Sequence, residues 1–572
     1  MYNERFWKKN WDPEIKDLDS ELWETTFVEA IRPTLEELSD KIAFVFFGVE
    51  LTFGEIDKYS NQFANMLINN GFKPGDIVGI NLPNIPECVI AYLGTLKAGC
   101  SASGISPLLS EIQMQYQLEN LGEAGKQVGL ITLDIIFANR IVKFATKLSQ
   151  LKLIITTNIG SFLPKIKQFL GKLLKKIPKG KVTSIPNKIN INFMDILKNY
   201  STDKPDIKIT PDDIAFILFT GGTTGQPKGA TLTHKNVVCD LIIVSNWLGW
   251  ERGKGFAVSG FPFFHMGGLY FLEHCLYLGW GQALIPNPRD IDFIVKVIEK
   301  YKPTALVNVP SLFQLLLKNS KFRNLDHSNV IGCISAASPF PKESQEELES
   351  VVGKGKLLEC YGCTETTALT TMNPSKGLKK LGTVGVPMTN IELKLIDPAT
   401  GDEVSLGEPG EICVRGDMVM KEYYQRPEET KNAIDVDGFM HTGDVGIMDE
   451  DGYIRIVDRT KDMIIVSGYK VYSSKVEDIL TKHPAIDTIA TIGIPNPERP
   501  GSEHVKAYIK LDPNYDYDGN EDALKAEIID FAKEHCAPFE VPKIIEFAEE
   551  LPYTLIGKID KKALRTQNLE NE

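Results

Sequence analysis

A glycine- and threonine-rich segment, residues 220–229 (TGGTTGQPKG), directly follows a run of apolar residues. Glycines let the backbone turn sharply and present N–H groups to an anion, and Lys228 directs a positive charge toward phosphate oxygens. The segment is not a Walker A loop, because Pro227 precedes the lysine and Gly229 follows it where that motif has Ser or Thr. We predict a phosphate-binding loop of another class; the alternative is a polar turn without a ligand.

The elements that position this loop alternate between strand-like and helix-like segments. The predicted strands are residues 214–220, 282–286, 305–309, 331–335 and 357–361, and the predicted helices are residues 235–248, 291–301, 311–319 and 342–352. Alternation of this kind predicts an α/β domain with largely parallel sheets. The phosphate loop follows the first of these strands.

The pattern changes beyond Gly382. Residues 391–456 contain short strands and turn signals, which predict a β-rich subdomain, and residues 458–462 (DRTKD) form a polar linker between apolar runs. The residues that follow are enough for a small α+β domain. We expect a large multi-layered N-terminal domain over residues 1–457, a hinge at 458–462, and a small C-terminal lid domain over 463–572.

Size and composition restrict the class of protein. A chain of 572 residues, 43% hydrophobic and 24% charged, fits a soluble protein of two or more domains. The net charge of -13 argues against a nucleic-acid partner. The nine cysteines are scattered, which favours a reducing compartment, and the CxxC at Cys360 and Cys363 lacks the second pair of a zinc site. Because the charged N-terminus lacks the apolar segment of a signal peptide, we expect a cytoplasmic protein.

One basic segment stands apart from this acidic background. Residues 135–194 contain twelve Lys or Arg and no Asp or Glu, and within them residues 159–182 interleave lysines with apolar side chains. A basic amphipathic helix is typical of peripheral membrane contact. The alternative is a solvated insertion whose apolar stripe packs on its own domain.

Further motifs accompany the phosphate loop along the chain. They are FPFFHMGG at 261–268, SAASP at 335–339, YGCTE at 361–365, HTGD at 441–444, DRTKD at 458–462, SGYK at 467–470 and GKI at 557–559. In this order, and over essentially the whole chain, they resemble the adenylate-forming superfamily of acyl-CoA synthetases, firefly-type luciferases and peptide synthetase adenylation domains. The chain departs from the family pattern at Gly221, where Ser or Thr is usual, and in SAASP, where the family has SGGAP.

The resemblance implies binding of ATP and Mg²⁺. The β- and γ-phosphates would be held by Thr220, Gly221, Gly222, Thr223, Thr224, Gly225 and Lys228. Glu365 would bind Mg²⁺ with Thr220 helping, and Thr364 would bond the α-phosphate. The adenosine would contact Ala336, Ala337, Ser338, Tyr361, Gly362, Asp444 and Arg459. Because the attacking carboxylate and ATP are both anionic, catalysis is mainly charge neutralisation and positioning, to which Lys558 would contribute at the α-phosphorus.

The resemblance also implies a second half-reaction, in which the thiol of coenzyme A attacks the acyl carbonyl. Lys461 aligns with the residue about which the small domain rotates in the family. Gly468 would let the pantetheine pass close to the backbone, and Lys470 would contact the CoA phosphates. His265 is assigned to the acyl or thiol tunnel by its position alone.

Two features favour a medium- or long-chain fatty acid as the substrate. Residues 284–291 (LIPNPRDI) and the basic segment are similar to segments of long-chain acyl-CoA synthetases. We therefore predict an ATP- and Mg²⁺-dependent fatty acid–CoA ligase. The alternatives are a CoA ligase for aryl or short branched acids, an acyl-AMP ligase that loads a carrier protein, and a non-catalytic lipid- or nucleotide-binding protein; assembly as a homodimer is left open.

Overall fold

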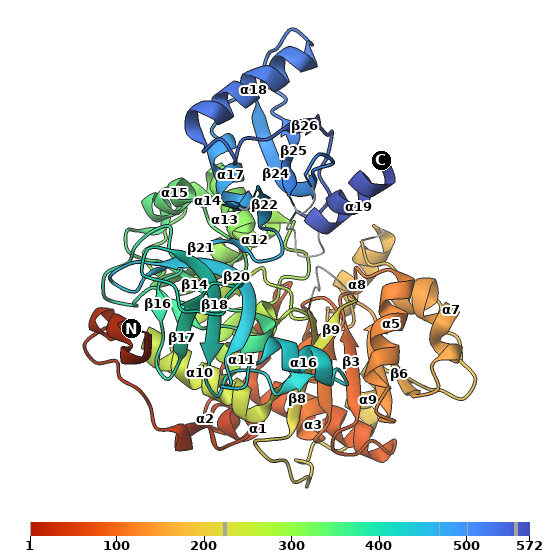
Figure 1. Ribbon diagram of the computed structural model, residues 1–572. Coiled ribbons are helices and arrows are strands. Elements are labelled where there is room, and N and C mark those ends of the chain that lie inside the picture. The colour runs from red at the N-terminus through yellow and green to blue at the C-terminus, as the bar shows by residue number, and fades with distance from the viewer. Residues whose placement is uncertain are drawn as a thin grey trace. The chain divides into compact units, whose positions relative to one another are not determined.

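The computed structural model describes residues 2–174, 176–220, 226–467, 469–499, 502–553 and 559–571 (Figure 1). The chain divides into two compact units, residues 1–392 with 414–440, and residues 393–413 with 441–572. Several sheets and many helices make up the larger unit, which confirms the mixed α/β fold predicted from the sequence. The hinge at 458–462 and the boundaries on either side of it stay predictions.

The first large sheet of the larger unit has nine strands in the order β16–β15–β14–β13–β12–β10–β11–β1–β2. The six central strands pair in parallel, and antiparallel strands β2, β15 and β16 complete the two edges. The strands are β1 Ile42–Phe46, β2 Val49–Thr52, β10 Phe256–Ser259, β11 Gly281–Ala283, β12 Ala305–Asn308, β13 Gly332–Ser335, β14 Leu357–Tyr361, β15 Thr371–Met372 and β16 Val386–Pro387. The helices between them are α11 Met266–Leu278, α12 Ile291–Tyr301, α13 Pro310–Lys318, α14 Ser320–Arg323 and α15 Lys342–Val352.

The second large sheet has eight strands in the order β19–β9–β8–β4–β3–β5–β6–β7. Neighbouring strands pair in parallel from β8, through β4, β3, β5 and β6, to β7. Strands β9 and β19 are added in antiparallel orientation at the β8 edge. The strands are β3 Ile77–Asn81, β4 Ser101–Gly104, β5 Val128–Leu133, β6 Leu151–Thr157, β7 Ile189–Asn192, β8 Ile214–Thr220, β9 Lys228–Thr233 and β19 Glu422–Tyr423. The remaining α-helices of this unit are α1 Phe27–Ala30, α2 Arg32–Glu37, α3 Phe53–Asn69, α4 Pro86–Lys97, α5 Glu111–Leu121, α6 Asp134–Ile136, α7 Val142–Phe144, α8 Lys165–Leu173, α9 Phe193–Asn199, α10 His234–Leu248 and α16 Pro427–Ala433.

The smaller unit contains most of a four-stranded sheet, followed by the C-terminal strands and helices of an α+β arrangement. The four-stranded sheet has the order β17–β18–β20–β21, with β17 Glu392–Ile396, β18 Pro409–Arg415, β20 Met440–Met448 and β21 Ile454–Arg459. It is followed by β22 Ile464–Val466, β23 Tyr469–Val471, α17 Ser473–Leu480, β24 Ile486–Pro495, β25 Glu503–Leu511, α18 Glu521–His535, β26 Ile544–Phe547 and α19 Lys561–Asn571. Val476, Ile489, Ile509 and Ile528 contribute to its own hydrophobic core.

The predicted elements in the middle of the chain form at or within a few residues of their expected positions. Strands β8 and β14 and helices α12 and α15 have the predicted bounds. Helix α12 buries Ile294 and Ile298 in the same cluster as Leu306 of β12, which explains why its apolar spacing is so regular. Strand β11 is shorter than predicted and ends before Pro286, a residue that cannot donate a hydrogen bond to a neighbouring strand.

Two findings bear on membrane contact. Within the described ranges, every helix falls short of the length and apolar character that a transmembrane span requires. Helix α8, however, lies in the basic segment and leaves its apolar side chains largely exposed: Ile166 75%, Phe169 68%, Leu170 47% and Leu173 68%, with Leu174 following at 64%. Most of the apolar surface of this helix is therefore left uncovered by the residues that the structure describes.

Candidate active site

The hairpin of β8 and β9 holds both ends of the predicted phosphate loop. Thr220, the last residue of β8, pairs with Lys228, the first residue of β9, and the Thr220 hydroxyl donates to the Lys228 carbonyl oxygen at 3.4 Å. Both residues are half-buried. The predicted loop residues between them, Gly221, Gly222, Thr223, Thr224 and Gly225, lie outside the described residues.

The second group of predicted site residues lies at the end of strand β14 and directly after it. The strand ends at Tyr361, whose carbonyl oxygen accepts hydrogen bonds from the Thr370 backbone at 2.8 Å and the Thr370 hydroxyl at 3.1 Å. The chain then turns at Gly362, where an added Cβ would lie 1.8 Å from the Ala368 carbonyl oxygen. The turn leads into a single helical turn, η6 (Thr364–Thr366), so that Glu365 lies beyond the carboxyl end of a parallel strand, where α/β proteins commonly bind ligands.

Tyr423 contacts Glu365 and Lys228. Its hydroxyl donates to Oε1 of Glu365 at 2.7 Å, and Nζ of Lys228 lies 5.1 Å from the centroid of its ring. Burial and the adjacent carboxylate raise the pKa of Tyr423, so its hydroxyl remains protonated and able to donate. The structure thus links two predicted site residues through a third that the motifs did not include.

Residue type and spacing do not single out Tyr423 in the sequence, because it is one of two adjacent tyrosines. The register of β19 against β9 places the two tyrosines on opposite faces of the sheet. Tyr423 pairs with Ala230, two residues after Lys228, so the tyrosine and the lysine share a face of the sheet. Tyr424 lies on the opposite face, where its hydroxyl donates to the Leu121 carbonyl oxygen at 3.3 Å.

The predicted adenine-side residues follow β13, which lies beside β14 in the same parallel sheet. Ala336, Ala337 and Ser338 therefore come at the same edge of the sheet as Tyr361. Ala337 has φ of 75°, a left-handed conformation that costs a residue with a Cβ roughly 1–2 kcal/mol relative to glycine. The departure from the family's Gly-Gly pair thus falls on a position whose backbone suits glycine.

His265 lies at the N-terminus of α11. Its Nδ1 accepts a hydrogen bond from the Gly267 backbone N–H at 3.3 Å, so the side chain caps the helix. This contact accounts for the position of the ring. The predicted role in an acyl or thiol tunnel stays a prediction.

In the smaller unit, Asp444 and Arg459 pair across β20 and β21. Nε of Arg459 donates to Oδ1 of Asp444 at 2.9 Å, and the Asp444 side chain is only 10% exposed. Within β20, Gly443 has φ of 71°, which departs from extended backbone, makes a local turn before Asp444 and is adopted by glycine without strain. This turn is fixed by Thr442, whose hydroxyl donates to the Ile412 carbonyl oxygen at 2.8 Å and accepts from the Asp444 backbone N–H at 3.2 Å.

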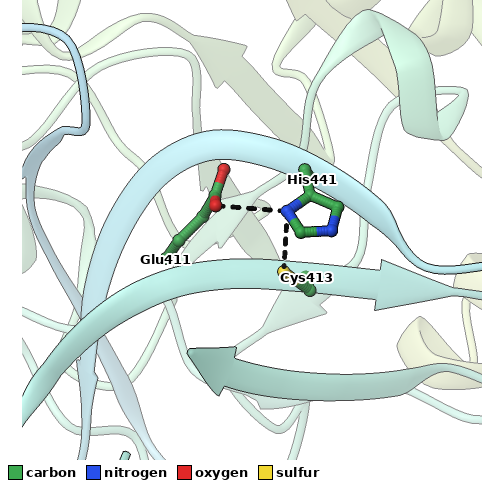
Figure 2. Close-up of side chains that lie close together, drawn as sticks. All are labelled: Glu411, Cys413 and His441. Carbon is green, nitrogen blue, oxygen red and sulfur yellow. Dashed lines mark hydrogen bonds and ion pairs between the residues drawn. The ribbon is translucent and has the colours of Figure 1, made fainter. Parts of the chain in front are cut away.

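Three further side chains support this turn (Figure 2). Glu411 Oε1 accepts from the Gly443 backbone N–H at 3.0 Å, Glu411 Oε2 lies 3.2 Å from Nδ1 of His441, and Cys413 Sγ lies 3.6 Å from the same nitrogen. Their potential ligand atoms lie within 4.8 Å of one another, a spacing that a metal ion could also bridge. Their bonds to one another and to Gly443 connect β18 to the turn that precedes Asp444.

The residues assigned to the hinge and to CoA are also in the smaller unit. Burial and the positive charge of Arg459 lower the pKa of Lys461 to about 8. Lys470 Nζ lies 2.9 Å from both carboxylate oxygens of Asp397, so its charge is already paired with an acid. Gly468 and Lys558 lie outside the described residues.

Comparison with known sequences identifies the family. The model of the AMP-binding enzyme family matches residues 32–424, and that of the AMP-binding enzyme C-terminal domain matches residues 475–558. The chain belongs to the AMP-binding enzyme family. The family resemblance predicted from the motifs is therefore confirmed.

Curated relatives within this family are similar along nearly their whole length. A long-chain-fatty-acid–CoA ligase of Escherichia coli O157:H7 is 35% identical over 550 residues, which cover 95% of this chain and 94% of the relative. A protein of the same name from Bacillus subtilis (strain 168) is 37% identical over 541 residues, which cover 93% and 92%.

Solved structures show the same fold. The anthranilate CoA ligase AuaEII in complex with anthranoyl-AMP aligns with a TM-score of 0.82 at 26% identity, over 97% of this chain and 99% of that one. ATP-bound MatB from Rhodopseudomonas palustris aligns with a TM-score of 0.78 at 24% identity, over 95% and 98%.

Proposed function

We propose that this protein is a long-chain fatty acid–CoA ligase, which activates a fatty acid with ATP and transfers the acyl group to coenzyme A. The observation that carries this proposal is a sequence identity of 35–37% to two long-chain-fatty-acid–CoA ligases over more than nine-tenths of each chain. Both family models match, so the similarity includes the C-terminal domain as well as the AMP-binding domain.

In the first half-reaction, a carboxylate oxygen of the fatty acid attacks the α-phosphorus of ATP, and the bond to the leaving pyrophosphate breaks. Lys228 and Thr220, at the two ends of the phosphate loop, bind the phosphate oxygens together with the loop residues between them. Thr364 bonds the α-phosphate, and Lys558 offsets the charge that develops there.

Glu365 fits the requirement for a Mg²⁺ ligand. Its carboxylate is half-buried, and a neutral donor, the Tyr423 hydroxyl, holds its Oε1. Carboxylate oxygens are ligands that Mg²⁺ prefers. Thr220 supplies a second oxygen. When bound there, Mg²⁺ would neutralise charge on the phosphate oxygens.

On the nucleoside, Tyr361 stacks on the adenine beside Gly362 and the Ala336–Ser338 segment. Asp444 accepts hydrogen bonds from the ribose hydroxyls, and Arg459 also reaches the ribose. The Asp444 carboxylate suits neutral hydroxyl donors because Arg459 already balances its charge.

In the second half-reaction, the thiol of CoA loses its proton to water and its sulfur bonds to the acyl carbonyl carbon, while the bond to AMP breaks and AMP leaves with the electron pair. Rotation about Lys461 would remove Lys558 and bring Gly468 to the pantetheine. Lys470 would exchange Asp397 for the CoA phosphates, and His265 would border the tunnel.

Pyrophosphate release over a panel of acids, with and without CoA, tests this function. Long-chain fatty acids should give the highest kcat/KM, and acyl-CoA should appear only when CoA is present. Preference for benzoate, anthranilate or short branched acids would favour the aryl or short-chain alternative. Pyrophosphate release without any thioester on CoA would instead indicate a carrier-protein acceptor.

We further propose that this protein, as a cytoplasmic enzyme, binds the surface of anionic membranes through α8. The helix and the residue after it expose five apolar side chains, a patch that monomeric soluble proteins rarely leave uncovered. Lysines lie beside them, including Lys165, and the surrounding segment has no acidic residue. An apolar stripe flanked by lysines complements an anionic bilayer, and a fatty acid substrate partitions into that same phase.

Sedimentation with vesicles tests the membrane proposal. The double variant Phe169→Gln/Leu173→Gln should lose binding to vesicles of phosphatidylglycerol and phosphatidylcholine, while keeping its activity on a water-soluble acid. Ile112→Gln, which replaces an apolar residue of α5 that is 80% exposed, is the matched control and should bind like the wild type. Unchanged vesicle binding of the double variant would refute the proposal. If the double variant instead had a lower molecular mass in solution than the wild type, α8 would be assigned to contact between two copies of the chain.

A further inference from the structure

We propose that Tyr423 is a positioning residue that aligns the Glu365 carboxylate and the Lys228 ammonium for a single magnesium–phosphate ligand. The inference rests on the proposed function, because that function assigns these two side chains to Mg²⁺ and phosphate. Tyr423 itself needs no contact with ATP: it acts through its two neighbours.

The hydroxyl and the ring of Tyr423 act on different groups. The hydroxyl donates to Glu365 Oε1 at 2.7 Å, which restricts the rotation of the carboxylate. The ring receives the Lys228 ammonium at 5.1 Å from its centroid, which favours one placement of a flexible side chain. One residue thus orders both a negative and a positive group.

The chemistry of the donor matters as well as its position. A tyrosine hydroxyl orders a carboxylate without neutralising it, whereas Arg or Lys in the same place would compete with a cation for its charge. Because the tyrosine is buried at 7% exposure, water competes little for the bond. The arrangement orders the Glu365 carboxylate through a neutral donor, which suits an oxygen ligand of Mg²⁺.

The segment around Tyr423 is held firmly enough to serve as a reference point. The Met420 backbone N–H donates to the Glu365 carbonyl oxygen at 2.7 Å, and the Tyr424 backbone N–H donates to the Gly229 carbonyl oxygen at 2.7 Å. The Tyr423 backbone N–H donates to the Thr430 hydroxyl at 2.9 Å. Residues 420–424, which include β19, therefore connect the turn that carries Glu365 to the strand that carries Lys228.

Magnesium titration of the full-length enzyme tests the inference. Tyr423→Phe removes the hydroxyl and keeps the ring. It should raise the Mg²⁺ concentration for half-maximal pyrophosphate release by about tenfold, the size expected for a lost hydrogen bond to a charged group. Saturating Mg²⁺ should restore most of kcat, and thioester formation from supplied acyl-AMP should stay at the wild-type rate.

Two further variants sharpen the result. Tyr424→Phe, which removes the hydroxyl of the neighbouring tyrosine, is the matched control and should leave the Mg²⁺ dependence unchanged. Tyr423→Leu also removes the ring, so it should add an increase of about fivefold in KM for ATP through Lys228.

An unchanged Mg²⁺ half-saturation in Tyr423→Phe would overturn the inference. So would an equal loss of both half-reactions, because that pattern indicates a general folding defect. Failure of the proposed function looks different: the wild-type enzyme would then release no pyrophosphate with any fatty acid.

Discussion

Two carboxylates, Glu365 in the larger unit and Asp444 in the smaller one, are held by side chains from neighbouring elements, but their partners differ in charge. A neutral tyrosine hydroxyl donates to Glu365 at 2.7 Å, whereas the Arg459 guanidinium donates to Asp444 at 2.9 Å. The first partner orders the carboxylate and leaves its charge available. The second orders the carboxylate and balances its charge.

The ligand suited to a carboxylate therefore depends on the group that holds it. An ordered, uncompensated carboxylate attracts a divalent cation, and an ordered, compensated one is better suited to accept hydrogen bonds from neutral hydroxyls. The family motifs assign Glu365 to Mg²⁺ and Asp444 to the ribose by resemblance alone, without a physical reason for the difference. Their partners, which come from β19 and β21, distinguish them.

The largest effect is expected at Glu365. Glu365→Gln keeps an oxygen for the Tyr423 hydroxyl but removes the negative charge, so pyrophosphate release should fall by about 10²–10³-fold, the range seen when one electrostatic contact to a transition state is lost. The rate should be measured at several Mg²⁺ concentrations. Thioester formation from supplied acyl-AMP is the internal control, and an equal loss there would contradict a role confined to adenylation.

Asp444→Asn should have a smaller effect of a different kind. The amide still offers an oxygen to a ribose hydroxyl but leaves the Arg459 charge without its partner, so KM for ATP should rise by about 10-fold to 10²-fold. The Mg²⁺ half-saturation should not move. If Asp444→Asn and Glu365→Gln changed the Mg²⁺ dependence to the same extent, the distinction between the two carboxylates would fail.

Glu411 should contribute less again, since it acts on Asp444 through the Gly443 turn. Glu411→Ala removes the acceptor of the Gly443 N–H and should raise KM for ATP by about threefold to tenfold. Glu411→Gln can still accept that bond and should recover most of the loss. Equal effects of the two variants would mean that the charge of Glu411, and not its hydrogen bond, supports the turn.

A third carboxylate extends the comparison to stability. Glu359 of β14 accepts a hydrogen bond from the neutral amide of Gln345, and burial raises the pKa of Glu359 to about 8. A raised carboxyl pKa adds stability below its unfolded value of about 4.3, and that contribution is lost as the pH rises through about 8. Between pH 5 and 8, the melting temperature of Glu359→Gln should therefore rise relative to that of the wild type. A constant difference in melting temperature between Glu359→Gln and the wild type over this pH interval would show that Glu359 is not protonated in the folded protein.

Regular patterns made several elements predictable. The strands and helices of residues 291–301 and 342–361 follow their predicted bounds, because alternating apolar spacing records which face of each element is buried. The motifs likewise single out Glu365, Asp444 and Lys228, since each of these residues lies within a short run of characteristic composition. The motifs did not identify Tyr423. Its contacts depend on the pairing of a two-residue strand with a partner about 190 positions earlier in the chain, which local sequence does not encode.

The α/β class, the family and the residue types available for adenylation follow from local periodicity and from motifs. Which group holds each acid follows only from the folded structure. It placed β19 at the edge of the eight-stranded sheet, set Arg459 opposite Asp444, and left the apolar face of α8 exposed while α12 buried its own. Burial and the charge of a neighbour depend on contacts between separate elements, which propensity and spacing do not specify.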